Sequence, residues 1–135
     1  MAKILIPALI PQVHKVIIKH PVTGETTFQS LDGSEVQLII HVVGRNSNQW
    51  LDFMRELKVS GSDDRNELFS RISEKSREFV AKLIVGWDEN GAINESYSEE
   101  AALKLLMDAN NTWILEQLQA AILDENNFFL MSFKN

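Results

Sequence analysis

The feature that most constrains the fold is a change in hydrophobic pattern between Gly44 and Asn46. Before this point, short runs of β-branched residues alternate with turn residues, as in strands. After it, apolar residues recur every three or four positions, as in amphipathic helices. Because the two patterns occupy separate parts of the chain, the sequence predicts an α+β fold. We expect one domain over residues 1–135, with a β-rich part at 1–45 and a helical part at 46–135.

The β-rich part predicts a small antiparallel sheet of about three strands. Pro21 can fix φ for a first turn, Gly24 permits the left-handed backbone that closes it, and Asp32-Gly33 supplies a second turn. A sheet of this size cannot stand alone, so one of its faces must pack on the helices. The three expected strands are Val13–His20, Glu25–Gln29 and Val36–Val43.

The helical part predicts a bundle of about four helices. Asn46-x-x-Gln49 resembles a capping box for the first helix, and Asp64-x-x-Glu67 can cap a longer second helix that reaches Ile84. A third, short helix follows, and Asn110-Asn111 separates it from a fourth that ends at Asp124 to Asn127. The small N-terminal sheet is therefore expected to pack on a C-terminal helical bundle.

The junction between the second and third helices is the most informative local segment. Gly86 can end a helix in a left-handed turn, Trp87 can cover the helix end, and Ser98 can cap the next helix. These residue types favour a shaped joint and a binding role over catalysis. Two interpretations of Trp87 stay open, because tryptophan serves both as core packing across such a joint and as an anchor for a partner.

The charge distribution limits the possible partners. Residues 1–58 hold six Lys/Arg and five Asp/Glu, whereas residues 59–135 hold seven and fourteen. An acidic second half repels phosphate backbones, so we expect no nucleic-acid partner and favour a basic protein partner instead.

The N-terminal apolar run is broken by Pro7 and Pro11 and is too short for a signal sequence or a membrane span. The absence of cysteine excludes disulfides and thiol chemistry and fits a reducing cytoplasm.

No pattern in the sequence predicts catalytic, cofactor-binding or metal-binding residues. His14, His20 and His41 have no carboxylate at metal-motif spacing, so solvated or edge histidines are the favoured interpretation. Acidic pairs such as Glu99-Glu100 are explained by capping at helix starts. The glycines form no phosphate-binding or nucleophile motif. We therefore expect a protein that is not an enzyme.

The C-terminal segment is rich in aromatic residues and follows the last helix stop. It is either a final strand or turn docked on the core, or an exposed apolar patch that meets another chain, since monomers seldom leave such a surface in water. Its residues Phe128, Phe129, Met131 and Phe133 join Trp87 as the candidate partner contacts.

The order of these parts resembles the tail assembly chaperones of long-tailed, lambda-like bacteriophages. The resemblance rests on the turn at Pro21 to Glu25, the strand ending at Val43-Gly44 and the tryptophan-bearing helix. It also rests on the block that runs from Leu83-Ile84-Val85-Gly86-Trp87 through an acidic loop to Tyr97-Ser98-Glu99-Glu100-Ala101-Ala102-Leu103. The end from Asn127 to Asn135 is also similar. The resemblance covers roughly residues 13–135 and carries no fixed catalytic or ligand residues with it.

The resemblance implies a non-enzymatic assembly factor in the cytoplasm of an infected host. Such proteins coat the aggregation-prone tape measure protein, bring major tail (tube) protein subunits to it, and leave before the virion is finished. Coating a long client implies self-association through head-to-tail contacts that do not close into a ring. The apolar ends, Phe128–Phe133 or Ile4–Ile10, could make these contacts.

Three other functions stay open at the level of the sequence. A structural minor tail or head–tail connector protein would have similar composition but would remain in the finished particle. A small enzyme or metal-dependent regulator would use the three histidines. A generic adaptor domain would bind proteins outside phage assembly.

Overall fold

The computed structural model describes residues 9–11, 13–30, 32–44, 47–60, 72–124 and 129–131, and the side chains of all of these except 9–11, 57–60 and 129–131. Strands and helices follow one another along the chain as the change of pattern predicts, with exceptions given below. In chain order the elements are β1 (Leu9–Pro11), β2 (His14–Ile18), β3 (Phe28–Gln29), β4 (Glu35–Val36), β5 (Leu38–Val42), α1 (Asn48–Ser60), α3 (Glu74–Leu83), β6 (Ile84–Trp87), α4 (Glu99–Met107), the 3-10 turn η1 (Ala109–Asn111), α5 (Thr112–Leu123) and β7 (Phe129–Met131).

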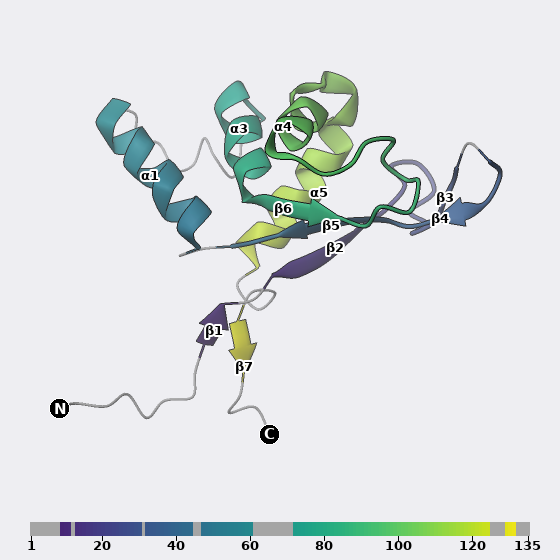
Figure 1. Ribbon diagram of the computed structural model, residues 1–135, viewed down its shortest axis with the longest axis horizontal. Coiled ribbons are helices and arrows are strands. Elements are labelled where there is room, and N and C mark those ends of the chain that lie inside the picture. The colour runs from purple at the N-terminus through teal and green to yellow at the C-terminus, as the bar shows by residue number, and fades with distance from the viewer. Residues whose placement is uncertain are drawn as a thin grey trace.

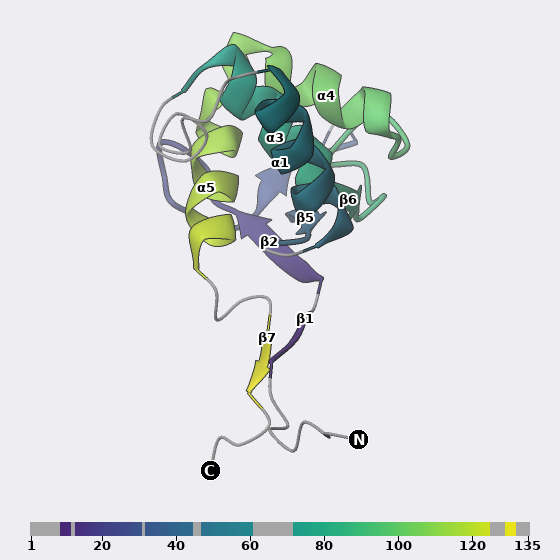
Figure 2. The ribbon, with the colours of Figure 1, turned by 90° about the vertical axis from the view of Figure 1, so that its left-hand side faces the viewer.

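The central feature is an antiparallel sheet of three strands in the order β2-β5-β6 (Figure 1). Helices α3, α4 and α5 lie together on one face of this sheet in both ribbon views (Figures 1 and 2). Strand side chains alternate accordingly: Val16 and Ile18 are buried, whereas Ile17 between them is 44% exposed. The predicted α+β fold, with a small sheet on about four helices, is therefore confirmed.

The third strand of the sheet differs from the one predicted. Residues Ile84–Trp87 were expected to end a helix at Gly86, but α3 ends at Leu83 and they form β6, paired with β5. Two β-branched residues favour this extended conformation. Gly86 is favoured here because a Cβ would lie 3.2 Å from Nδ1 of His41, the residue opposite it in the ladder, and would crowd that side chain. The part predicted as purely helical thus contributes a strand to the sheet.

The segment predicted as the second strand has a smaller role. Of Glu25–Gln29, only β3 (Phe28–Gln29) is extended, and it pairs with β4 in a separate two-stranded sheet. The turns themselves are as predicted, since Gly24 and Gly33 have φ of 74° and 88°. The ring of Phe28 lies 5.9 Å from that of Trp113, which joins this hairpin to α5.

Of the predicted second helix, expected from Asp64 to Ile84, the structure describes residues 72–84, and there the helix runs from Glu74 to Leu83. The proposed cap Asp64 lies outside the described residues, and α3 starts at Glu74 behind the N-cap Ser73. Ser73 and Ser76 form a reciprocal capping box, with backbone-to-hydroxyl distances of 2.8 and 3.1 Å. In contrast, the predicted cap of α4 is confirmed: Ser98 Oγ accepts from the backbone N–H of Ala101 at 3.0 Å.

One hydrophobic core joins the sheet to the helices. Phe79 of α3 is fully buried and contacts aromatic rings of α1, with ring centroids 5.2 Å from Trp50 and 4.9 Å from Phe53. The largest fully buried side chains come from β2, β5, α3, β6, α4 and α5: Phe79, Ile18, Ile40, Leu83, Ile84, Leu106, Leu115, Leu118, Val42 and Val80. Residues from both predicted parts therefore share a single core.

Two polar side chains fix the helices relative to one another and to the sheet. Arg77 of α3 donates to the carbonyl oxygen of Leu106 at 2.6 Å and to Thr112 Oγ1 at 2.8 Å, so its cation holds the end of α4 and the start of α5. Gln117 of α5 accepts from the N–H of Lys19 at 2.7 Å and donates to its carbonyl oxygen at 2.9 Å. The Gln117 amide therefore satisfies both backbone groups just beyond the end of β2.

Strands β1 and β7 form a second antiparallel pair, which joins segments near the two ends of the chain. Leu9 is opposite Met131, and Pro11 is opposite Phe129. Both ribbon views show this pair beyond the face of the main sheet that the helices leave free (Figures 1 and 2). Among the described residues, none of the helices combines the length and apolar character needed to span a bilayer.

Candidate functional site

The joint after α3 is closed by its own aromatic residues. Trp87 is 5% exposed, and its ring packs edge-on against Tyr97 with centroids 5.2 Å apart. Its Nε1 donates to the carbonyl oxygen of Glu95 at 3.0 Å, and the Tyr97 hydroxyl donates to that of Ile84 at 2.8 Å. The structure therefore places Trp87 in the core, packed across the joint. Too little of the indole is exposed for it to form much contact with a partner.

The other candidate contacts lie at the C-terminus. Phe128 and Phe133 lie outside the described residues. Phe129 and Met131 belong to β7, whose backbone pairs with β1, and their side chains lie outside the description. The structure therefore brings the two apolar ends together as strands, and it does not bring Trp87 to them.

His41 and His20 have different partners. His41 Nε2 lies 2.7 Å from Asp88 Oδ1, across the β5–β6 ladder. His20 Nδ1 accepts from the backbone N–H of Val22 at 3.1 Å and of Thr23 at 3.2 Å, within the first turn. In the part of the chain that the structure describes, no three His, Cys, Asp or Glu side chains converge as metal ligands would.

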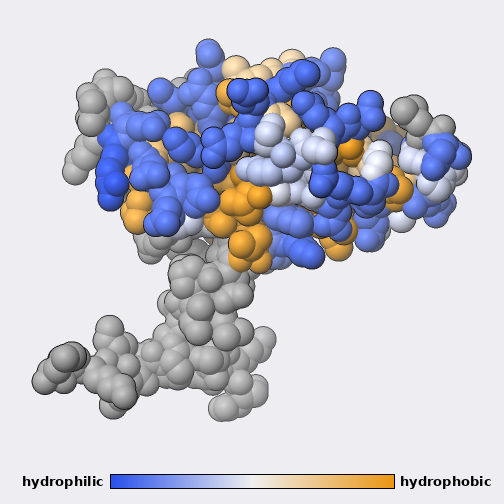
Figure 3. Space-filling model, in the orientation of Figure 1, coloured by the Kyte–Doolittle hydropathy of each residue, from blue (hydrophilic) through white to orange (hydrophobic). Residues whose placement is uncertain are grey.

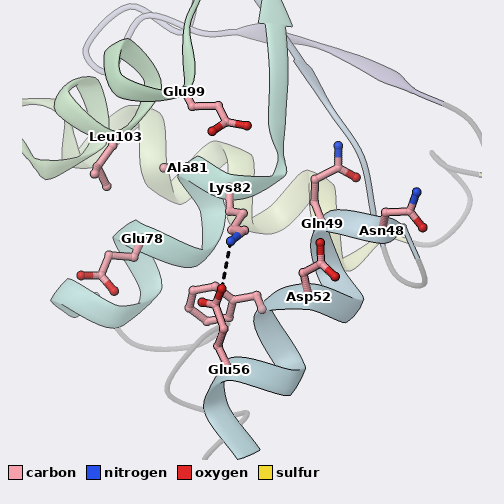
Figure 4. A pocket seen from close by; sticks show the side chains of 10 residues that line it. Asn48, Gln49, Asp52, Glu56, Glu78, Ala81, Lys82, Glu99 and Leu103 are labelled. Atoms are coloured by element: carbon pink, nitrogen blue, oxygen red, sulfur yellow. Dashed lines mark hydrogen bonds and ion pairs between the residues drawn. The ribbon is translucent and has the colours of Figure 1, made fainter. Parts of the chain in front are cut away.

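A groove between α1, α3 and α4 is the clearest candidate site (Figure 4). Its volume is about 600 Å³, and it is open to solvent along one side. Helix α1 contributes Asp52, Phe53 and Glu56, α3 contributes Ala81 and Lys82, and further lining residues are Asn48, Gln49, Glu78, Glu99 and Leu103. Phe53 and Ala81 are buried and form an apolar floor, whereas the polar side chains form the walls.

The groove carries more negative than positive charge. Four carboxylates line it, and Lys82 is the single Lys or Arg among its lining residues. Lys82 Nζ lies 3.2 Å from Glu56 Oε1, so this cation is already paired across the groove. Figure 4 shows the carboxylates of Asp52 and Glu99 directed toward the space between the helices.

Not all of this negative charge has a partner within the fold. Asp52 lies 3.4 Å from Arg55, one helical turn along α1. Glu99 is the first residue of α4, where the helix dipole stabilises an acid. Glu78 is in the middle of α3, and no ion pair is recorded for it among the described residues. The groove therefore keeps a net negative potential toward solvent.

An exposed apolar ridge continues from the groove along α4. Leu103 is 41% exposed and Met107, one turn later, is 40% exposed. The sequence did not separate them from the core face, because α4 is apolar on nearly all sides (Ala101, Ala102, Leu103, Leu105, Leu106 and Met107). Only the packing shows that Ala101, Ala102 and Leu106 face inward. Figure 3 shows one face of the molecule, on which hydrophobic residues lie between hydrophilic ones.

The chain was compared with family models, with curated proteins and with solved structures, and none of the three comparisons gave a match.

Proposed function

We propose that this protein is a tail assembly chaperone of a lambda-like, long-tailed bacteriophage. In this role it is not an enzyme: it binds and solubilises the tape measure protein and recruits major tail protein subunits. The observation that carries the proposal is the groove between α1, α3 and α4, which combines an apolar floor with unbalanced carboxylates and opens to solvent. Such an open, half-polar surface suits a macromolecular partner, whereas sites for small substrates are mostly apolar and bury most of the ligand.

The sequence resemblance and the fold are compatible with this role. The block that carries the resemblance, from Leu83 to Leu103, forms the end of α3, strand β6, the closed joint and the first part of α4. It therefore shapes one wall of the groove while its tryptophan stabilises the core. The proposed place of action is the host cytoplasm, and the proposed chaperone is absent from the mature virion.

Self-association is the second element of the proposal, and the β1–β7 pair supports it. Each of these strands has one edge that pairs with no other described strand. Free edges offer unpaired N–H and C=O groups to another chain, and a two-stranded ribbon is marginal by itself. Pairing of this ribbon with that of the next subunit would give the head-to-tail contacts that a coating protein needs.

The decisive experiment is co-expression with the tape measure protein. This chain is expected to move that client from the insoluble to the soluble fraction, while a chain unfolded by Leu118→Asp, at a fully buried core position, is expected to give no rescue. An insoluble client in the presence of folded protein would refute the chaperone role. Detection of this chain in purified phage particles would instead indicate the structural alternative, a minor tail or head–tail connector protein.

The self-association is tested separately by truncation. Deletion of residues 128–135 removes β7, so the concentration dependence of sedimentation is expected to weaken strongly. Deletion of residues 1–6, which leaves both β1 and β7 in place, serves as the control. If the chain lacking 128–135 sediments with the same concentration dependence as the full chain, the terminal ribbon is not the contact.

A further inference from the structure

We propose that the groove between α1, α3 and α4 docks an amphipathic helix with lysine or arginine beside its apolar stripe. In the proposed chaperone, the docked helix would be a segment of the client protein. Only the identity of that client rests on the proposed function. The groove itself is defined by the side chains of three helices and by their charge.

The apolar part of the groove fits a helix laid along it. The floor consists of Phe53 at 5% and Ala81 at 6% exposure, and Leu103 forms one edge. A small residue such as Ala81 permits the close approach of an incoming helix, and the buried ring of Phe53 closes the floor beneath it, so the exposed apolar contacts come from α4. Leu103 and Met107 extend this apolar surface by one turn of α4, which gives an incoming helix a second row of contacts.

The charge of the groove selects a cationic helix. Asp52, Glu78 and Glu99 lie along its walls. Lys82 pairs with Glu56 and Arg55 with Asp52, so the net negative potential of the groove comes mainly from Glu78 and Glu99. Lysine or arginine residues flanking an apolar stripe would reach these carboxylates from both sides of the bound helix. The same carboxylates repel phosphate, which argues against nucleic acid as the occupant. They also disfavour the acidic helices of a second copy of this chain.

The experiment measures binding of a synthetic peptide to the full-length protein. The probe is a fluorescent 18-residue helical peptide with leucine at i, i+3 and i+4 spacing and lysine on both sides of that stripe. A second peptide has glutamate in place of every lysine. Fluorescence anisotropy is expected to show binding of the lysine peptide, weakening as salt rises, and at least tenfold weaker binding of the glutamate peptide.

A charge-neutralised variant locates the binding in the groove. Removal of three groove carboxylates is expected to weaken binding of the lysine peptide roughly tenfold, and removal of three exposed carboxylates elsewhere by less than about twofold, although both variants change net charge equally. The groove variant is Asp52→Asn, Glu78→Gln and Glu99→Gln; the control is Glu89→Gln, Glu95→Gln and Glu116→Gln.

A matched pair of leucine variants tests the apolar contact. Leu103→Ser is expected to weaken binding several-fold, and Leu123→Ser, at a 53% exposed leucine of α5 away from the groove, is expected to leave it unchanged. Circular dichroism and thermal unfolding show that each variant is folded before binding is measured.

Two results would overturn the inference. Equal weakening by the groove variant and its control would show that binding depends on overall charge alone. Loss of self-association in the groove variant, with the peptide affinity unchanged, would show that another copy of the chain occupies the groove. Failure of the chaperone role is distinguishable from both: the peptide would still bind in the groove, but the tape measure protein would stay insoluble.

Discussion

The joint around Trp87 and the groove beside it are built from neighbouring segments in opposite ways. In the joint, the indole and the Tyr97 ring face inward, and their polar atoms donate to backbone carbonyls of the same segment. In the groove, carboxylates and Leu103 face outward, and the one cross-helix ion pair, Lys82–Glu56, is largely exposed. The inward-facing side chains of the joint stabilise the fold, whereas the outward-facing side chains of the groove are available to bind a partner.

The largest effect is expected at the joint. Trp87→Ala removes a buried indole that packs on Tyr97, and should lower the free energy of unfolding by about 3–5 kcal/mol. Leu103→Ala at the groove should cost less than about 1 kcal/mol, because that side chain is already 41% exposed. Urea denaturation of both variants measures the contrast. Similar losses at the two positions would show that the groove is part of the core after all.

The next effect concerns the strand that begins the joint. Gly86→Ala places a Cβ 3.2 Å from Nδ1 of His41, which should destabilise the protein by about 1–3 kcal/mol. Shortening the opposing side chain relieves this contact. Gly86→Ala in a His41→Ala background should therefore lower the free energy of unfolding markedly less than it does in the wild-type protein. A double-mutant cycle in urea measures the coupling, and additive effects would mean that the two residues do not compete for this space.

A smaller effect is expected from the hydroxyl that closes the joint. Tyr97→Phe removes the hydrogen bond to the Ile84 carbonyl and should cost about 1 kcal/mol. Burial raises the pKa of Tyr97 above its ordinary value of 10.0, and the negative charge of Glu99 raises it further. Stability from this group is therefore fully present below pH 10 and is lost as the pH rises through the raised value in the folded protein.

Alkaline unfolding measures this pH dependence. As the pH rises above about 10, the wild-type protein should lose stability more steeply than Tyr97→Phe, because the variant has no hydroxyl to ionise at this position. Glu99→Gln is the informative companion, since it keeps the hydrogen bond but removes the charge that faces the phenol. Identical alkaline slopes in wild type and Tyr97→Phe would exclude the phenol as the titrating group.

The smallest effect is expected for the groove charges. Asp52→Asn and Glu78→Gln should each change the free energy of unfolding by no more than about 0.5 kcal/mol. Asp52 is exposed and has one exposed ion pair, and Glu78 is half-buried with no ion pair to a described residue. Thermal unfolding at low and high salt measures this. A loss above about 2 kcal/mol would show that these acids stabilise the fold and would remove the distinction between the groove and the joint.

Local signals in the sequence were sufficient where one residue determines the geometry. Gly24 and Gly33 adopt the left-handed backbone that their turns require, and Ser98 caps α4 as predicted. Prediction was wrong at Ile84–Trp87, because a short apolar run with glycine is compatible with both a helix end and a buried strand. Pairing with β5, which lies more than forty residues earlier, decides between them.

The candidate site was less predictable than the fold. Trp87 was a candidate contact because of its residue type, yet the fold places it in the core. The groove draws on three helices, and nothing within one helix indicates that Asp52, Glu78 and Glu99 line a common space. The excess of acid in the second half was visible, but its position on the surface was not.

The sequence by itself determined the α+β class, the turns, the Ser98 cap of α4 and the negative charge, because each depends on residue types or on short-range spacing. Tertiary structure decided the remainder: β6 completes the sheet, Trp87 closes a joint, and three separate helices enclose an acidic groove. The physical reason is that strand pairing and side-chain burial depend on contacts between residues far apart in the chain, and those contacts override local preference.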